Sequence, residues 1–332
     1  MLSVICPIYN EKKYIAECIH SIVAQDYPKD DMEVLFVDGM SDDGTRDIVR
    51  DFTKEYPYIS LVDNPQRIVP VAMNIGIKAS RGQIIIRLDA HAKYPADYFS
   101  TLTAALERLH ADNVGVVCHT DVLNKSPKTL AIKEVLGNKF GVGNSSFRTG
   151  IKDVQEVDTV PFGCWRREVF DRYGLYDTRL VRNQDIELNK RIKRGGGHIF
   201  IIPDTCCTYM ARETYKALAR NNYGNGKWNI LTVYYTGQLG SLSVRHFIPL
   251  AFVLSLLLPS LAALLFPVIG LVALVSLACY LSLLCGISIQ LGVTKRLNVF
   301  YLLGTFVTLH LSYGWGSLAG ILDVCRKRMT KK

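Results

Sequence analysis

Several patterns that would assign this chain of 332 residues to a common class are missing from it. The N-terminal segment MLSVICPIYN has neither a basic stretch nor a small-residue cleavage site, so it does not resemble a secretory signal peptide. The nine cysteines include no C-x-x-C pair, and Cys206 and Cys207 are adjacent. Unpaired thiols are typical of a reducing compartment. We therefore expect the soluble part of the chain to lie in the cytoplasm.

Two common nucleotide-binding motifs are missing as well. The first predicted strand, residues 2–8, ends in the segment P-I-Y-N-E (residues 7–11) and not in G-x-G-x-x-G, which gives no support to a nicotinamide or flavin site. The loop from Gly39 to Thr45 lacks the lysine of a P-loop. If the chain binds a nucleotide, its phosphates must be held by a metal ion and side chains rather than by a glycine-rich loop.

Charged residues are almost absent between 247 and 322, a region rich in Leu, Val and Ala. It contains three apolar stretches of the length, about 20 residues, that a helix needs to cross a bilayer: 247–266, 268–291 and 298–322. We predict a cytoplasmic domain at 1–235 and a multi-pass region in the cell (inner) membrane at 236–332. Much of the net charge of +9 flanks these stretches, which favours anionic lipids or phosphorylated substrates and no nucleic acid as partner.

The basic residues around the three stretches give conflicting topologies. The positive-inside rule places Arg245, the Lys295-Arg296 loop and the basic tail from Arg326 all in the cytoplasm. Three complete spans cannot satisfy this placement. Either one stretch is re-entrant or interfacial, or the tail breaks the rule, and the sequence leaves both possibilities open.

Strands and helices alternate in the first 118 residues. Short apolar runs rich in β-branched residues predict strands, and apolar residues at helical spacing predict helices. The predicted strands are 2–8, 34–37, 59–62, 84–88 and 114–118, with helices between them, including one at 98–109. This alternation at short spacing indicates an α/β fold with a mostly parallel sheet and helices on both faces.

Polar residues follow three of these strands: Tyr9 to Glu11, Asp38, and Asp89 with His91. The carboxyl ends of parallel strands share one edge of the sheet, where ligands bind in open α/β folds. Acidic loop ends gathered on one edge repel each other unless a cation or hydrogen-bond donors neutralise them. We predict that Asp89 and His91 bind a divalent metal, Mg²⁺ or Mn²⁺. Each of these carboxylates also has a structural explanation, since it could simply cap a turn or a helix.

Five motifs follow one another along the chain: PIYNE from Pro7, VDGMSDDGT from Val37, AMNIG from Ala72, LDAH from Leu88 and NQD from Asn183. Over about residues 2–194, their order and spacing resemble those of family 2 glycosyltransferases with the GT-A fold. Together with the apolar C-terminal region, DAHAKYP makes the chain most similar to bacterial succinoglycan-type exopolysaccharide transferases. The resemblance implies that Asp185 is the catalytic base. It also implies that the donor is bound by Pro7, Tyr9, Glu11, Asp38, Asn74 and Asp89.

The chain departs from the family pattern at several positions. Gly39 and Met40 stand where the family has Asp and Gly, so recognition of the base rests on Asp38 alone. His91 replaces the second Asp of the D-x-D metal motif, and Gln184 replaces the Glu of E-D. The loop 161–165 is expected on the acceptor side, where its tryptophan either stacks on a sugar or is buried.

The resemblance implies inverting, metal-dependent transfer of one sugar from a nucleotide sugar, a UDP-hexose, to a lipid-linked glycan in exopolysaccharide or cell-surface polysaccharide synthesis. Such a reaction needs a cation at the leaving diphosphate and a base at the acceptor hydroxyl, roles that fall to Asp89 and Asp185. If Asp185 only starts a helix, Glu187 is the next candidate. A processive polysaccharide synthase and a non-catalytic nucleotide-sugar sensor remain alternatives. The sequence determines neither the sugar, the acceptor, the linkage nor the oligomeric state.

The Q-x-x-R-W motif of processive synthases is absent from the chain, and Arg220 to Tyr223 with Lys227-Trp228 echo it only loosely. We therefore expect a single sugar to be added per acceptor. Mass spectrometry of the product formed from a labelled donor should show an increase of one residue. A ladder of long products would contradict this prediction and favour the synthase.

Overall fold

The computed structural model describes residues 1–143 and 145–330. The chain divides into two units, each built from two separate segments. The first unit comprises Met1–His119 and Ser146–Met210, and the second comprises Thr120–Ser145 and the chain from Ala211 onward. The segment 211–235, which the sequence assigns to the catalytic domain, thus groups with the C-terminal region. The predicted domain boundary itself stays a prediction.

The first unit is organised around β1 (Leu2–Ile8), whose residues are almost all buried. This strand pairs in parallel with β2 (Met32–Asp38) and with β4 (Ile84–Arg87), and β2 pairs in parallel with β3 (Ile59–Asp63). Four consecutive pairs in register join β1 to β4, from Leu2 with Ile84 to Ile5 with Arg87. All four strands therefore end at the same edge of the sheet, as the sequence predicts.

The remaining strands turn this parallel half into a mixed sheet. β8 pairs antiparallel with β4 and β6, and β5 and β7 pair antiparallel with β9. Within the described residues the strand order is β3-β2-β1-β4-β8-β6-β9-β5, with β7 also on β9. The bounds are β5 (Ala92–Lys93), β6 (Asn113–Asp121), β7 (Gln155–Glu156), β8 (Cys164–Arg166) and β9 (Ile199–Met210).

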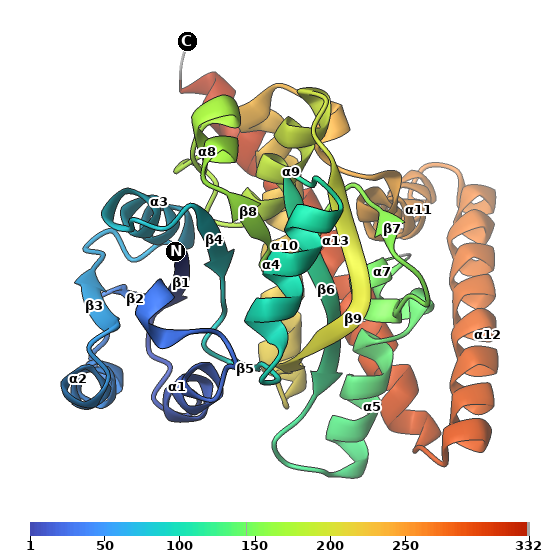
Figure 1. Cartoon of the computed structure of the whole chain (residues 1–332). Coiled ribbons are helices and arrows are strands. Elements are labelled where there is room, and N and C mark those ends of the chain that lie inside the picture. Colours follow the sequence, from blue (N-terminus) through green and yellow to red (C-terminus); the bar gives the residue numbers. More distant parts are fainter. Residues whose placement is uncertain (144, 331–332) are drawn as a thin grey trace. The chain divides into compact units, whose positions relative to one another are not determined.

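Helices cover both faces of this sheet (Figure 1). Side chains alternate between the faces along a strand, so Val4 and Phe36 join one apolar cluster while Ile5 and Leu35 join the other. The first cluster includes residues of α1 (Ile15–Val23), α2 (Thr45–Glu55) and α4 (Tyr98–Arg108). The second includes residues of α3 (Val69–Ala79), α8 (Glu168–Tyr173) and α9 (Gln184–Arg194). The predicted α/β class with two helical layers is confirmed.

The second unit is helical. Its elements are α5 (Pro127–Leu136), α6 (Lys139–Val142), α10 (Tyr215–Thr236), α11 (Ile248–Ala262), α12 (Gly270–Lys295) and α13 (Val299–Met329). α10 and α13 pack with their backbones in contact: a Cβ atom on Gly226 would lie 1.9 Å from the Tyr313 carbonyl oxygen, and one on Gly316 would lie 2.0 Å from that of Tyr223. Only glycine permits this approach, so a glycine on each helix allows the backbone of the other to come close.

Two helical segments of the second unit are long and apolar enough to cross a membrane, Val244–Ala262 and Pro267–Lys295. They correspond to the first two apolar stretches of the sequence. The third stretch, 298–322, lies in α13 and is not one of the two. Its buried residues face other helices, for example Leu302, Phe306 and Leu309 in a cluster with α5 and α12.

The glycine of the AMNIG motif allows α3 to approach β1. A Cβ atom on Gly76 would lie 2.5 Å from Cγ2 of Ile5, which is fully buried in the sheet. We expect Gly76→Ala to lower the free energy of unfolding by about 1–3 kcal/mol, because the added methyl group overpacks this contact. Urea unfolding of the detergent-solubilised chain measures the effect. Gly240→Ala is the matched control, since its Cβ meets nothing within 4 Å, and an equal loss in both variants would contradict the explanation.

Candidate active site

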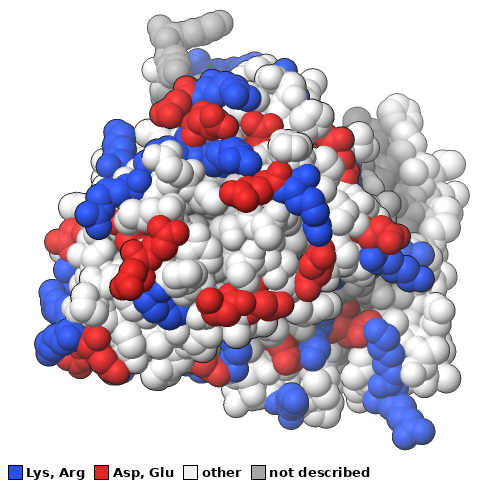
Figure 2. All heavy atoms as spheres, in the orientation of Figure 1, with Lys and Arg blue, Asp and Glu red and all other residues white. Residues whose placement is uncertain are grey.

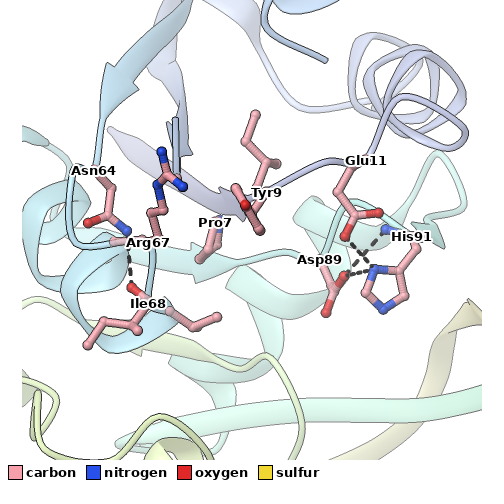
Figure 3. A pocket seen from close by; sticks show the side chains of 12 residues that line it. Pro7, Tyr9, Glu11, Asn64, Arg67, Ile68, Asp89 and His91 are labelled. Carbon is pink, nitrogen blue, oxygen red and sulfur yellow. Dashed lines mark hydrogen bonds and ion pairs between the residues drawn. The ribbon is translucent and has the colours of Figure 1, made fainter. Parts of the chain in front are cut away.

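A cleft lies at the carboxyl-terminal ends of β1, β2, β3 and β4 in the first unit (Figure 3). It contains about 450 Å³ of empty space, part of it open to solvent. Its lining includes five of the predicted site residues: Pro7, Tyr9, Glu11, Asp89 and His91. The other lining residues are Ile8, Gly39, Asn64, Arg67, Ile68, Val69 and Ala72. The shared edge of the parallel strands therefore brings together residues that are far apart in the sequence.

The loop after β1 is held by the loop after β2. The backbone N–H of Asn10 donates to Ser41 Oγ (2.8 Å), and that of Glu11 donates to Thr45 Oγ1 (2.8 Å). Asn10 and Met40 both adopt the left-handed backbone conformation, with φ of 55° and 60°. Met40 stands where the family pattern has glycine, which adopts this conformation without steric cost. The hydroxyl and carboxylate groups of the VDGMSDDGT segment thus shape the cleft by bonding backbone groups.

Three charged side chains meet at one end of the cleft. His91 Nδ1 lies 2.7 Å from Asp89 Oδ1 and 3.2 Å from Glu11 Oε1. Burial alone would lower the pKa of His91, but the two carboxylates raise it well above its usual range. Burial alone would raise the pKa of Asp89, but the His91 and Arg87 cations lower it. The imidazolium therefore occupies the position between two carboxylates where a cation is needed.

The donor set at this end is small for a metal ion. In the part of the chain that the structure describes, no group of three or more His, Cys, Asp or Glu side chains is arranged to hold one. Mg²⁺ is commonly bound through one or two carboxylates, with the remaining positions filled by water and substrate phosphates. Asp89 together with His91 or Glu11 fits that incomplete kind of site. The residues therefore fit a metal that is shared with a phosphorylated ligand rather than one held by protein alone.

The opposite end of the cleft is formed by Asn64 and Arg67, and Tyr9 lies between them and the acidic end (Figure 3). The Arg67 guanidinium carbon lies 5.9 Å from the centre of the Tyr9 ring, and Tyr9 is 44% exposed. A Cβ atom on Gly39 would lie 3.1 Å from Tyr9 Cδ2, so the glycine that replaces the family aspartate leaves room for this ring. Asn64 and Arg67 are not among the residues predicted from the sequence, because they lie in a loop that carries no motif.

Asp38 and Asn74 are placed differently from the cleft residues. The Asp38 carboxylate is fully buried and accepts hydrogen bonds from Ser41 Oγ and Arg46 Nη1, both at 2.5 Å. The side-chain amide of Asn74 exchanges two hydrogen bonds with the backbone of Tyr176. Neither residue is part of the cleft lining described above. Their predicted contacts with a nucleotide stay predictions, and the structure gives both a role in positioning loops.

Asp185 lies in the first turn of α9, as predicted, and is partly buried. Its carboxylate accepts a hydrogen bond from the backbone N–H of Ile186 (2.9 Å), and the helix N-cap is Asn183. Glu187, the alternative base, is buried and forms two hydrogen bonds with Arg191, at 3.0 and 2.7 Å. Arg191 in turn donates to the carbonyl of Leu175. Glu187 is therefore committed to an ion pair. Asp185 is not among the cleft-lining residues named above, and its role as the base stays a prediction.

Arg87 is a residue of this region that was not predicted from the sequence. It ends β4, two residues before Asp89, and is 7% exposed. Within the described residues, its Nε and Nη1 atoms are buried without a hydrogen-bond partner. Burial alone would lower the pKa of this guanidinium, but the nearby Tyr176 hydroxyl and the carboxylates of Asp185 and Asp89 raise it. A charged residue at the end of the apolar run QIIIRL was the signal that could have found it.

The two interpretations of Trp165 are resolved in favour of burial. Trp165 lies in β8, is 1% exposed, and packs against Phe170 and Tyr176 with ring centres 5.7 and 6.5 Å apart. The side chain is thus part of the core and not available to stack on a sugar. The loop before it turns through Phe162 and Gly163, both with positive φ.

The structure is that of an α/β protein with a cleft at the strand ends, and one end of that cleft is acidic. The chain belongs to glycosyl transferase family 2, whose sequence profile matches residues 3–174. It is 30% identical over 226 residues to the succinoglycan biosynthesis protein ExoA of Rhizobium meliloti, covering 68% of this chain and 67% of that protein. The chain is therefore a glycosyltransferase by family, as the sequence motifs indicate.

A second relative comes from an archaeon. The dolichyl N-acetyl-alpha-D-glucosaminyl phosphate 3-beta-D-2,3-diacetamido-2,3-dideoxy-beta-D-glucuronosyltransferase of Methanococcus voltae is 28% identical over 253 residues. The alignment covers 72% of this chain and 78% of that protein. Both relatives thus align over most of their length.

Solved structures share the fold. The mannosyltransferase PcManGT of Pyrobaculum calidifontis, in complex with GDP-Man and Mn²⁺, superposes with a TM-score of 0.59 at 20% identity. It covers 97% of this chain and 87% of its own. TarS of S. aureus in complex with UDP-GlcNAc superposes with a TM-score of 0.53 at 15% identity, covering 97% and 92%. At these identities the likeness extends to the fold, which is GT-A-like as the sequence predicts.

Arg87 offers a test of whether the site rather than the fold requires its charge. We expect Arg87→Met to unfold at the same or higher urea concentration, because a buried charge with two unbonded nitrogens is replaced by an apolar side chain of similar length. Turnover should fall about tenfold or more, which corresponds to about 1.4 kcal/mol of transition-state stabilisation, because the guanidinium no longer acts on the carboxylates of Asp185 and Asp89. Arg87→Lys, which keeps the charge, should lose less. A variant that loses stability and activity together would indicate a structural role only.

Proposed function

We propose that the chain transfers one sugar from a nucleotide sugar, with a UDP-hexose as the first candidate, to a lipid-linked glycan at the cytoplasmic face of a membrane. The observation that carries this proposal is the cleft, which combines an aromatic and basic end at Tyr9 and Arg67 with an acidic end at Asp89. The Methanococcus relative acts on a dolichyl-linked acceptor by its name, and the Rhizobium relative belongs to succinoglycan biosynthesis. The first supports a lipid-linked acceptor, and the second supports a role in polysaccharide synthesis.

The two ends of the cleft suit the two ends of a nucleoside diphosphate. Tyr9 offers an exposed ring and Arg67 a cation beside it, which suits stacking on a base and contact with an anionic oxygen. Asp89 would hold a divalent metal together with His91, whose imidazolium would have to release its proton to become a ligand. The metal would neutralise the leaving diphosphate when bound. Asp38 stays our candidate for recognition of the base, acting with the loop that it fixes through Ser41.

Asp185 is the proposed general base. It is held in the first turn of α9, where its carboxylate accepts the hydrogen bond from the backbone N–H of Ile186. In the transfer step, the acceptor hydroxyl loses its proton to Asp185 while its oxygen forms a bond to the anomeric carbon. The bond from that carbon to the diphosphate breaks at the same time, and the diphosphate leaves with the electron pair. Attack from the face opposite the leaving group implies inversion at the anomeric carbon.

The incomplete donor set makes metal binding depend on the nucleotide. We expect Mn²⁺ to bind the chain at least about tenfold more tightly in the presence of UDP than in its absence, because the diphosphate supplies the missing oxygen ligands. The electron paramagnetic resonance signal of free Mn²⁺ measures the bound fraction. Asp89→Ala should abolish this difference. Equal affinity with and without UDP would argue against a shared metal.

The base and the metal ligand should respond differently to substitution. Asp185→Asn keeps the size and much of the hydrogen bonding of the side chain but cannot accept a proton, so turnover should fall about 10²–10⁴-fold with little change in donor affinity. Asp89→Ala should weaken metal-dependent donor binding itself. Turnover and donor affinity of the purified variants separate the two roles. An Asp185→Asn enzyme of near wild-type turnover would remove this residue from the catalytic step.

The donor and acceptor classes are tested together on native membranes. A panel of nucleotide sugars is supplied with and without EDTA, and the labelled lipid is identified by mass spectrometry. We expect one donor to label a lipid-linked glycan and EDTA to prevent labelling. Transfer that continues in EDTA would overturn the metal role, and donor binding without transfer or hydrolysis over a broad acceptor panel would favour a sensor.

A further inference from the structure

The turn between α11 and α12 is apolar and exposed. Leu264, Leu265, Phe266 and Val268 are 81%, 79%, 65% and 76% exposed, and η4 (Pro267–Ile269) forms the turn itself. Residues 256–275 contain one polar side chain, Ser260, and no charged residue. A turn that emerges into water on the far side of a membrane is normally marked by polar residues. This turn lacks them, and so it is suited to a hydrocarbon environment.

The two ends of this hairpin lie beside the same polar segment of the second unit. The Lys295 Nζ atom lies 2.7 Å from Glu134 Oε1 of α5. At the other end, η3 (Val244–Phe247) brings Arg245 next to Gly143, where a Cβ atom would lie 3.2 Å from Arg245 Cδ. α5 and α6 carry Lys128, Lys133, Glu134 and Lys139 and belong in water or at a headgroup surface. Both ends of the hairpin therefore start at an aqueous level.

Polar contacts accompany the hairpin for part of its length. Tyr280 of α12 lies with its hydroxyl 3.1 Å from His310 Nδ1, and His310 Nε2 lies 2.8 Å from the carbonyl oxygen of Phe140 in α6. One turn further, Ser255 of α11 and Ser276 of α12 share a hydrogen bond of 2.7 Å. Only the segment 256–275 extends beyond this pair. At about 1.5 Å per helical residue it reaches roughly 15 Å, about half of the ~30 Å hydrocarbon core of a bilayer.

α13 does not provide a span that would bring the chain back across a membrane. It packs against α10, which carries Lys216, Arg220 and Lys227. Lys227 Nζ lies 2.7 Å from Asp323 Oδ2 of α13. The side of α13 that faces α10 therefore lies against a polar helix over that length. Arg245, Lys295 and the basic end of α13 can then share one side, which removes the topological conflict that the sequence poses.

We propose that the α11–α12 hairpin enters a single leaflet of a bilayer and returns to the same side without crossing it. The basic residues at its base, Arg245, Lys295 and Arg296, face anionic lipid headgroups. The inference rests on the membrane attachment in the proposed function, but not on the chemistry of transfer. It replaces the multi-pass topology expected from the sequence with a re-entrant one.

Cysteine accessibility in the full chain tests this topology. Cys206, Cys279, Cys285 and Cys325, the cysteines that are not buried, are replaced by alanine. One cysteine is then introduced at the tip (Leu265→Cys) or, as the matched control, at the base (Arg296→Cys). A membrane-impermeant maleimide is applied to right-side-out and inside-out vesicles. The base should be labelled only from the cytoplasmic side. The tip should be labelled from neither side, below about one tenth of its labelling in detergent.

Labelling of the tip from the outer side would show a complete crossing and overturn the proposal. Labelling from the cytoplasmic side, or recovery of the chain in the soluble fraction, would show that the tip is not inserted. Both outcomes concern attachment alone, because sugar transfer by each variant is measured in detergent as a separate readout.

Depth-dependent quenching separates lipid from a protein partner as the group that covers the tip. A fluorophore on the tip cysteine, in vesicles that contain brominated lipids, should be quenched most by bromines near the middle of the acyl chains. The same fluorophore at Arg296→Cys should be quenched little. An unquenched tip would indicate cover by protein, including a second copy of the chain, and would overturn the proposal.

Discussion

Repulsion between the carboxylates at the ends of β1 and β4 is the constraint on which the cleft depends. Because β1 and β4 pair in parallel, Glu11 and Asp89, which follow them, lie at the same edge of the sheet. In the structure the side chain of His91 lies between the two carboxylates and offsets their repulsion. The carboxylates in turn raise the pKa of His91. A bound metal cation would offset the same repulsion between the carboxylates. The replacement of the second metal-motif aspartate by histidine thus gives the site a counter-ion of its own.

Hydrogen bonds to side chains hold the backbone of the two loops around this cluster. The side chains of Asp43 and Asn10 accept hydrogen bonds from backbone N–H groups of these loops. An ion pair between Asp38 and Arg46 holds the loop after β2. Most of the acidic residues in the motif VDGMSDDGT therefore act on the chain itself. Figure 2 shows acidic and basic side chains interspersed over the visible face, with no large area of one sign. The face in view therefore offers no broad surface potential of one sign.

The first half of the fold could be predicted because its signals are local. Apolar runs of β-branched residues fix β1, β2 and β4, and parallel strands share an edge whatever their sequence, so the sequence alone was enough to place Glu11, Asp89 and His91 together. β8 could not be predicted, since it is short and its position between β4 and β6 depends on distant pairing. Arg67 and Arg87 were not predicted, for different reasons. Arg67 lies in a loop without a motif, and Arg87 was counted as part of an apolar strand.

The interleaved organisation of the two units has a consequence for how the chain is made and cut. The first segment of the second unit interrupts the first unit in the sequence. Each unit is therefore complete only after part of the other unit has been synthesised. α5 emerges early but finds Leu302 and Phe306, with which its Ala131 and Val135 cluster, only after both apolar helices have been synthesised. Trimming the hydrophobic C-terminus to obtain a soluble enzyme would therefore strip α5 and α10 of their packing partners. A shortened chain of that kind is expected to aggregate, even though every motif residue of the cleft would still be present.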